Sequence, residues 1–213
     1  MLGRIEYDAL VPALVASVVG DMTTRALGIQ HTEYPATSQL ALVDAVTGRK
    51  QNLARPDLYS SVDPAPGGGL FLVTRLRPPF SRLLPASGFP SEIVVWDLEA
   101  KVIYTVATLP SHEGVPIEGV MTGPRHVPWR PTAPATLVWT EALDGGDPKT
   151  KAPHRDRLRS LAVPFQGEPK EVLRLEHRFR GITWGEQEGM AFVSDYDRDR
   201  RWTRTRMFDI STA

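Results

Sequence analysis

The stretch LFLVTRL, residues 70–76, shows the pattern that decides the fold: a short apolar and β-branched run that follows a turn rich in proline and glycine. Similar runs recur along the chain, each bounded by Gly, Pro or Asp. We expect strands at residues 38–45, 70–76, 92–98, 102–109, 136–143, 157–165, 181–185, 189–196 and 203–210. Because 19 prolines and 17 glycines in 213 residues leave little room for long helices, the sequence predicts an all-β chain.

A recurring order of elements groups these strands. Turn-rich segments that contain proline or tryptophan precede a hydrophobic run at Tyr59, His126 and Phe179. Within each unit we expect an inner strand, a polar turn, an apolar strand, a loop, a third strand, a hairpin and a fourth strand. Four antiparallel strands per repeated unit are typical of a β-propeller blade. The sequence therefore predicts a partial β-propeller of about three to four blades, fewer than most closed propellers contain.

The first part of the chain does not follow this pattern. Its apolar stretch, Ala9 to Gly20, contains Pro12 and is shorter than the roughly 20 residues that cross a membrane. Glu6 and Asp8 precede it, which is unlike a signal peptide. We expect a divergent segment at residues 1–33, either a short helix or part of a blade, and the propeller domain at residues 34–213.

Composition limits the possible partners. The 25 basic residues balance the 25 acidic ones, so no net charge favours nucleic acid or an anionic membrane. The absence of cysteine excludes disulfides, thiolate catalysis and Cys-ligated zinc. The stretch from Asp195 to Arg206 places Trp202 among arginines, as nucleic-acid patches do, but aspartates alternate with the positive charges. We interpret it as a solvated hairpin, and we expect a cytoplasmic protein with no cofactor.

Several segments carry a resemblance to a known family. The most specific are GPRHVPWR, residues 123–130, and EALDGGDPKTKAPHRD, residues 141–156. With YSSVDPAPGGGLFLVTRLRPPFS and FRGITWGEQEGMAFVSDY, they resemble the propeller portion of glutamyl-endopeptidase-type members of the prolyl oligopeptidase family, which are serine peptidases. The resemblance extends from about Tyr34 to Ile210. It implies a propeller that lies as a lid over an α/β-hydrolase domain with a Ser–Asp–His triad.

The chain departs from that family in its chemistry. It has no G-x-S-x-G nucleophile elbow, and its histidines lack the spacing of a nucleophile or metal site: His31, His112, His126, His154 and His177. We therefore expect no catalytic residues and no catalytic activity from this chain alone. The expected role is gating and substrate binding, with a separate α/β-hydrolase catalytic domain and a peptide substrate as partners.

Two other interpretations stay open. One is a stand-alone propeller scaffold that binds protein partners and completes its ring by oligomerising; the other is a fragment without an independent role. Incomplete blades at both ends would leave strand edges unpaired, and such edges template pairing with another chain. A homo-oligomer joined through exposed strand edges is therefore expected as well.

Two arginines are the candidate substrate-binding residues. Arg125 and Arg155 each offer a guanidinium group, which binds carboxylates bidentately and so suits a substrate with acidic side chains. The alternative is that both are structural and bond carbonyl groups between blades. The oxygen-rich loop between them suggests a cation site, but its spacing is not that of an EF-hand, and an ordinary hairpin loop with no metal is favoured: Asp144, Asp147, His154 and Asp156. We expect the tryptophans in or beside strands to pack between blades: Trp96, Trp129, Trp139 and Trp184.

Overall fold

A computed structural model describes residues 13–17 and 37–211, and nearly all of its regular structure is β-strand. The strands are β1 (Ala13–Ser17), β2 (Ser38–Val43), β3 (Lys50–Asp57), β4 (Tyr59–Pro64), β5 (Phe71–Leu76), β6 (Ser91–Trp96), β7 (Val102–Leu109), β8 (Thr136–Ala142), β9 (Asp156–Ala162), β10 (Lys170–Leu175), β11 (Arg178–Trp184), β12 (Met190–Asp197) and β13 (Trp202–Asp209). Two single turns of 3-10 helix, η2 (Ala86–Gly88) and η3 (His112–Gly114), complete the described elements.

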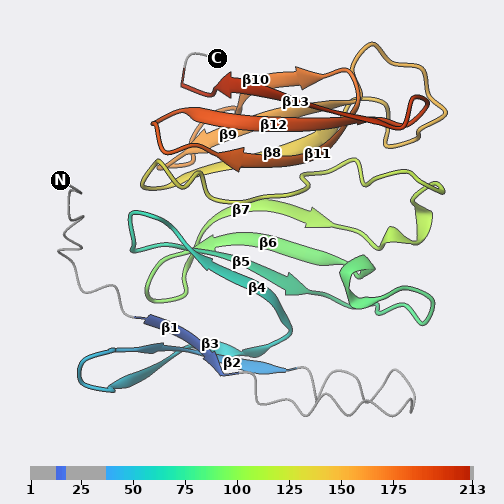
Figure 1. Ribbon diagram of the computed structural model, residues 1–213. Coiled ribbons are helices and arrows are strands. Elements are labelled where there is room, and N and C mark those ends of the chain that lie inside the picture. Colours follow the sequence, from blue (N-terminus) through green and yellow to red (C-terminus); the bar gives the residue numbers. More distant parts are fainter. Residues whose placement is uncertain (1–12, 18–36, 212–213) are drawn as a thin grey trace.

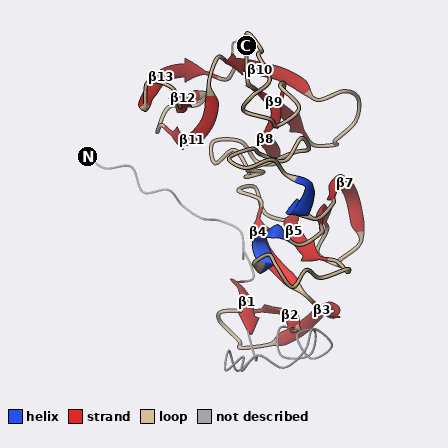
Figure 2. Ribbon diagram, turned by 90° about the vertical axis from the view of Figure 1, so that its right-hand side faces the viewer, coloured by secondary structure: helices blue, strands red, loops and turns tan. Residues whose placement is uncertain are grey.

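The strands form four antiparallel sheets. The first sheet has the order β1-β2-β3, the second β4-β5-β6-β7, the third β10-β9-β8 and the fourth β11-β12-β13. They stack face to face in chain order (Figure 1), and in the view from the strand ends the sheets follow one another along an arc (Figure 2). The predicted all-β partial propeller is confirmed.

Within the described residues the second sheet has four regular strands, and the other three sheets have three each. In the third sheet an irregular segment, residues 125–130, lies beside β8. Its Arg125 exchanges backbone hydrogen bonds of 2.8 and 2.9 Å with Thr140. The ladder cannot continue regularly, because Pro128 has no N–H and His126 adopts a left-handed φ of 50°.

The nine predicted strands are all found, with ends that differ by a few residues. The structure adds β3, β4 and β10, to which no run was assigned, although the expected order of elements provides for them. In β3 only Leu53 is buried, and Pro56 lies within the strand. Such a polar edge strand has little of the apolar alternation by which a strand is recognised. Ala13–Ser17, which fell in the unassigned first segment, is a strand that pairs with β2.

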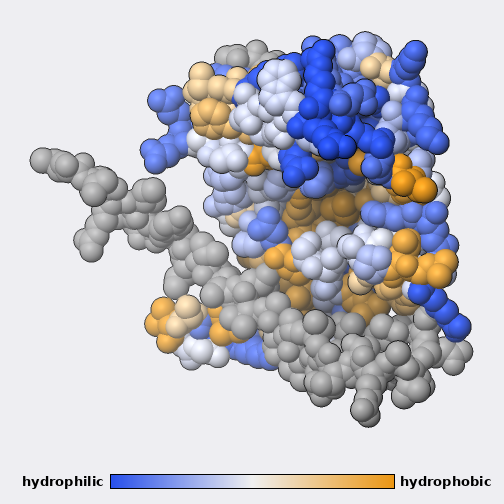
Figure 3. Space-filling view, turned by 45° about the vertical axis from the view of Figure 1, so that its right-hand side comes forward, coloured by the Kyte–Doolittle hydropathy of each residue, from blue (hydrophilic) through white to orange (hydrophobic). Residues whose placement is uncertain are grey.

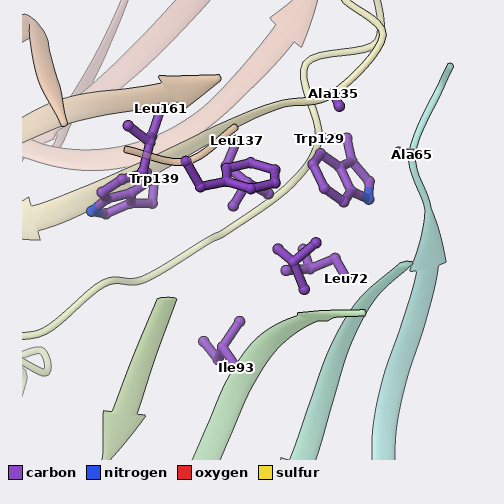
Figure 4. Packing of buried hydrophobic residues seen from close by; sticks show 10 residues of the cluster. Ala65, Leu72, Ile93, Trp129, Ala135, Leu137, Trp139 and Leu161 are labelled. Carbon is purple, nitrogen blue, oxygen red and sulfur yellow. The ribbon is translucent and has the colours of Figure 1, made fainter. Parts of the chain in front are cut away.

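Three apolar cores lie between successive sheets. The middle core brings Trp129, Trp139 and Leu137 of the third sheet against Leu72 and Ile93 of the second (Figure 4). The flanking cores include Trp96 between the first two sheets and Trp184 between the last two. The prediction that these tryptophans pack between blades is confirmed.

Connections alternate between the two ends of the sheets, because neighbouring strands run in opposite directions. We call one end the turn rim; it carries the short connections at residues 44–49, 65–70, 97–101, 163–169 and 185–189. The other end is the loop rim, which carries the long connections at residues 77–90 and 143–155 and the hairpin turn at 198–201. The connection at residues 110–135 begins at the loop rim. Figure 2 looks onto the loop rim.

Candidate functional site

A groove of about 1190 Å³ opens on the loop rim. It is lined by parts of the 143–155 loop of the third sheet, by residues 176–178 and 196–201 of the fourth, and by Glu118. Most of its lining residues are charged. Figure 3 shows hydrophilic residues gathered over the upper part of the molecule, where the third and fourth sheets lie in Figure 1. The groove is therefore suited to a polar ligand rather than to an apolar one.

Behind the groove, two aspartates are fully buried, and the first of them is Asp156 at the start of β9. Its Oδ1 accepts hydrogen bonds from Arg125 Nη2 and from Arg178 Nη1, each at 2.6 Å. Its Oδ2 accepts the backbone N–H of Phe179 at 2.7 Å. A carboxylate with three donors satisfies its lone pairs without water, which is how a buried charge is retained.

The second buried aspartate is Asp144, which follows β8. Its Oδ2 accepts from Arg155 Nη1 at 2.8 Å and from Arg178 Nη2 at 2.6 Å, while its Oδ1 accepts from the Gly146 N–H at 3.0 Å. Arg178 thus holds both aspartates, and it joins the fourth sheet to the third. We call Arg125, Arg155 and Arg178 the arginine cluster.

The electrostatics of the cluster follow from this geometry. Burial alone raises the pKa of Asp144, but the hydrogen bonds from Arg155 and Arg178 outweigh it and hold that pKa below its ordinary value. Burial lowers the pKa of Arg125, although Asp156 opposes the change. Three guanidinium groups face two carboxylates, so the cluster keeps one positive charge in excess.

The structure separates the two predicted arginines. Arg155 lines the groove with 27% of its side chain exposed. Arg125 is 11% exposed, is absent from the groove lining, and has a buried Nε without a partner in the described structure. Both bind carboxylates, and Arg155 also donates to the carbonyl of Thr150, in the same loop, at 3.3 Å.

The sequence analysis missed Arg178. It lies in the groove and contacts both buried aspartates. The only signal was its position directly before Phe179, where the last of the three repeated units was expected to begin. That position places an inner strand beside the start of β9, but the sequence does not show which side chain reaches across.

The oxygen-rich loop connects β8 to β9, as the hairpin interpretation expected. The carboxylates of Asp144 and Asp156 bind arginines, and Asp147 accepts the N–H of Lys149 at 2.9 Å. Within the part of the chain that the structure describes, no three His, Asp or Glu side chains are grouped to hold a metal ion. The stretch from Asp195 to Arg206 is also a hairpin, as predicted, and its first aspartate is buried against two arginines.

Comparison with known proteins finds two plant proteins that are similar in sequence to this chain. No family model matches it. It is 34% identical over 177 residues to a probable chloroplastic glutamyl endopeptidase of Oryza sativa subsp. japonica, a match that covers 81% of this chain and 19% of the relative. A probable chloroplastic glutamyl endopeptidase of Arabidopsis thaliana is 35% identical over 183 residues, which is 84% of this chain and 18% of the relative.

Solved acylaminoacyl peptidases are also similar. One from Pyrococcus horikoshii superposes with a TM-score of 0.44 at 13% identity, over 81% of this chain and 26% of the peptidase. Another, in complex with Z-Gly-Gly-Phe-chloromethyl ketone, gives 0.45 at 11% identity, over 81% and 27%.

These findings correct one expectation. The predicted cytoplasmic location is contradicted, because both plant relatives are named as chloroplastic. None of the described residues forms a helix of the length and hydrophobicity that a bilayer crossing requires.

The chain spans about a fifth of the length of the curated relatives it matches. Its all-β sheets and its sequence identity to those relatives agree with the resemblance stated from its motifs. This chain is a partial β-propeller whose sequence is similar to about a fifth of two probable glutamyl endopeptidases.

Proposed function

We propose that this chain gates access and binds substrate for a serine peptidase whose catalysis is supplied by an α/β-hydrolase domain. The observation that carries the proposal is the groove on the loop rim, in which Arg155 and Arg178 are held in place by buried carboxylates. The relationship to glutamyl endopeptidases supports it. The sequence has no G-x-S-x-G elbow, so this chain is assigned no chemical step.

Arg155 is the proposed contact for an acidic side chain of the substrate. Asp144 holds its Nη1, which restricts the guanidinium before a ligand arrives and lowers the entropy lost on binding. The excess positive charge of the arginine cluster favours a carboxylate over a neutral amide. Arg125 does not reach the groove, and its proposed part is indirect: with Arg178 it neutralises Asp156.

The proposal is tested by titrating the purified chain with two hexapeptides that differ only in one central residue, Glu or Gln. A charged hydrogen bond is worth roughly 1.5 to 3 kcal/mol, so we expect the Glu peptide to bind at least about tenfold more tightly. Arg155→Gln should remove this preference. Arg174→Gln is the matched control, because Arg174 is half-exposed on β10, pairs with Glu171 and does not line the groove.

Equal affinity for the Glu and Gln peptides in the unmodified chain would exclude acidic recognition by the groove. A preference that survives Arg155→Gln would move the contact to another residue. Neither peptide should be cleaved by the chain alone, and cleavage would contradict the non-catalytic assignment.

A second candidate, a scaffold that binds protein partners or a second copy of itself, is favoured by one observation. Phe192 and Met207 are opposite each other in the β12–β13 pairing and are 42% and 66% exposed. If this surface serves association, a Phe192→Ser, Met207→Ser variant should sediment as a smaller species than the unmodified chain at high concentration. Unchanged sedimentation with intact preference for the Glu peptide would favour the first candidate.

A further inference from the structure

The mouth of the groove is bridged by one ion pair. Glu118, in the connection between the second and third sheets, pairs with Arg198 in the β12–β13 turn of the fourth sheet. Both residues line the groove. Their side chains are 55% and 56% exposed, so water and ligands reach both partners. The pair therefore joins two elements that line the groove, without being buried.

The position of Glu118 is fixed by its neighbours in the chain. Glu118 has a left-handed φ of 60°, and Gly119 donates its N–H to the Pro116 carbonyl at 2.7 Å. Val120 donates its N–H to the Gly146 carbonyl at 2.9 Å, and Gly146 in turn donates to the buried Asp144. The loop that carries Glu118 is thus attached to the same turn that positions Arg155.

Arg198 is carried by an equally well-defined turn. The carboxylate of Asp197 accepts the N–H groups of Asp199 and Arg200 at 3.0 and 3.2 Å, which closes the turn around Arg198. Arg200 already has Asp197 as an ionic partner, at 3.7 Å. The only carboxylate paired with Arg198 in the described structure is that of Glu118, which comes from another sheet.

We infer that Arg198 is a second carboxylate-binding residue of the groove, and that Glu118 occupies it when no acidic ligand is bound. This rests on the proposed function, in which the groove takes acidic peptides. A ligand with two carboxylates would give one to Arg155 and the other to Arg198, in exchange for Glu118. Exposed ion pairs are weak, so a peptide carboxylate of the same chemistry can replace Glu118.

The experiment uses the intact chain and a hexapeptide with one Glu, compared with versions that carry a second Glu two, three or four residues further on. Glu118→Gln should raise the affinity for the best two-Glu peptide about two- to fivefold, which is the range of one exposed ion pair. Arg198→Gln should lower that affinity to the value of the one-Glu peptide. Both changes should affect the one-Glu peptide less than the two-Glu peptide, because its single carboxylate goes to Arg155.

Glu113→Gln is the matched control, because Glu113 is exposed in the same connection and has no ion pair among the described residues. It should leave every affinity unchanged. Loss of binding in Arg155→Gln with no effect of Glu118→Gln or Arg198→Gln would overturn the inference and leave the proposed function standing. Effects of Glu118→Gln and Arg198→Gln without an effect of Arg155→Gln would support the inference and reject the role of Arg155. Absence of any binding would overturn both.

Discussion

The two rims of the sheet stack are built differently. The turn rim reverses the chain within a few residues. One of its contacts between sheets is neutral: the Gly67 N–H donates to the Pro134 carbonyl at 2.7 Å and joins the second sheet to the third. The loop rim uses longer connections and joins the third sheet to the fourth through buried charges, with Arg178 between Asp144 and Asp156. The longer connections of the loop rim form a groove and contribute to the arginine cluster. The short turns of the turn rim only connect neighbouring strands.

The largest difference between the rims is expected when a buried carboxylate of the loop rim is removed. Asp156→Ala leaves Arg125 and Arg178 without their shared acceptor and the Phe179 N–H unsatisfied. Breaking a buried ion pair by removing one partner costs about 3 to 5 kcal/mol. We expect a loss of that size in the free energy of unfolding, measured by urea denaturation.

Asp147→Ala is the control for that prediction, since Asp147 lies on the loop that leads to Asp156 and its carboxylate accepts only the Lys149 N–H in the described structure. Its loss should be below about 1 kcal/mol. If Asp156→Ala were as mild as Asp147→Ala, the charges of the loop rim would not hold the sheets together. Asp156→Asn, which keeps an acceptor, serves if the alanine variant does not fold.

Glycine substitutions give a second, smaller contrast between the rims. Gly146 has a φ of 75°, and a Cβ there would lie 2.0 Å from the Val120 carbonyl oxygen. Gly167, on the turn rim, has a similar φ of 78° but open space around a Cβ. Gly167→Ala should cost only the left-handed conformation, about 1 kcal/mol, whereas Gly146→Ala adds a steric overlap and should cost about 2 to 3 kcal/mol.

Thermal or urea unfolding of the two alanine variants measures this contrast. Equal losses would mean that the 116–122 segment moves freely away from the Gly146 turn. In that case Glu118 would not be fixed beside the arginine cluster.

The ion pairs of the loop rim also predict a pH dependence. The folded-state pKa of Asp144 is lowered, so its contribution is complete above the ordinary aspartate pKa of 3.8 and is lost as the pH falls through the folded value. The difference in unfolding free energy between the unmodified chain and Asp144→Asn should therefore be constant near neutral pH and shrink below about pH 4, from roughly 2 kcal/mol. A difference that stays constant down to pH 2 would show that Asp144 is not held ionised by Arg155 and Arg178.

Much of the fold could be predicted from the sequence, because the strands that form the cores are rich in apolar and β-branched residues. LFLVTRL and VIYTVATL became β5 and β7 with almost the expected bounds. Polar edge strands such as β3 could not be recognised, since only one of its side chains is buried. The interrupted segment beside β8 was not anticipated either, because a left-handed His126 follows from tertiary contacts rather than from local propensity.

The site was predicted less completely. Arg155 was singled out from its residue type and its loop, and it lines the groove. Arg125 was singled out by the same reasoning, yet it is nearly buried against Asp156, because the burial of a long side chain depends on which sheet covers it. Arg178, at the start of β11, and Glu118, in the 110–135 connection, are distant in sequence, and only the stacking of sheets brings them to one groove.

The most direct test of the account is to map where an acidic peptide binds. Amide chemical-shift changes should be recorded by NMR while the isotope-labelled chain is titrated with the one-Glu hexapeptide and, separately, with its Gln counterpart. The account predicts that the Glu peptide shifts residues of the loop rim, at 148–155, 176–178 and 196–201, and leaves the turns at 65–70, 97–101 and 163–169 unchanged. Shifts centred on the turn rim, or equal shifts with the Gln peptide, would contradict it.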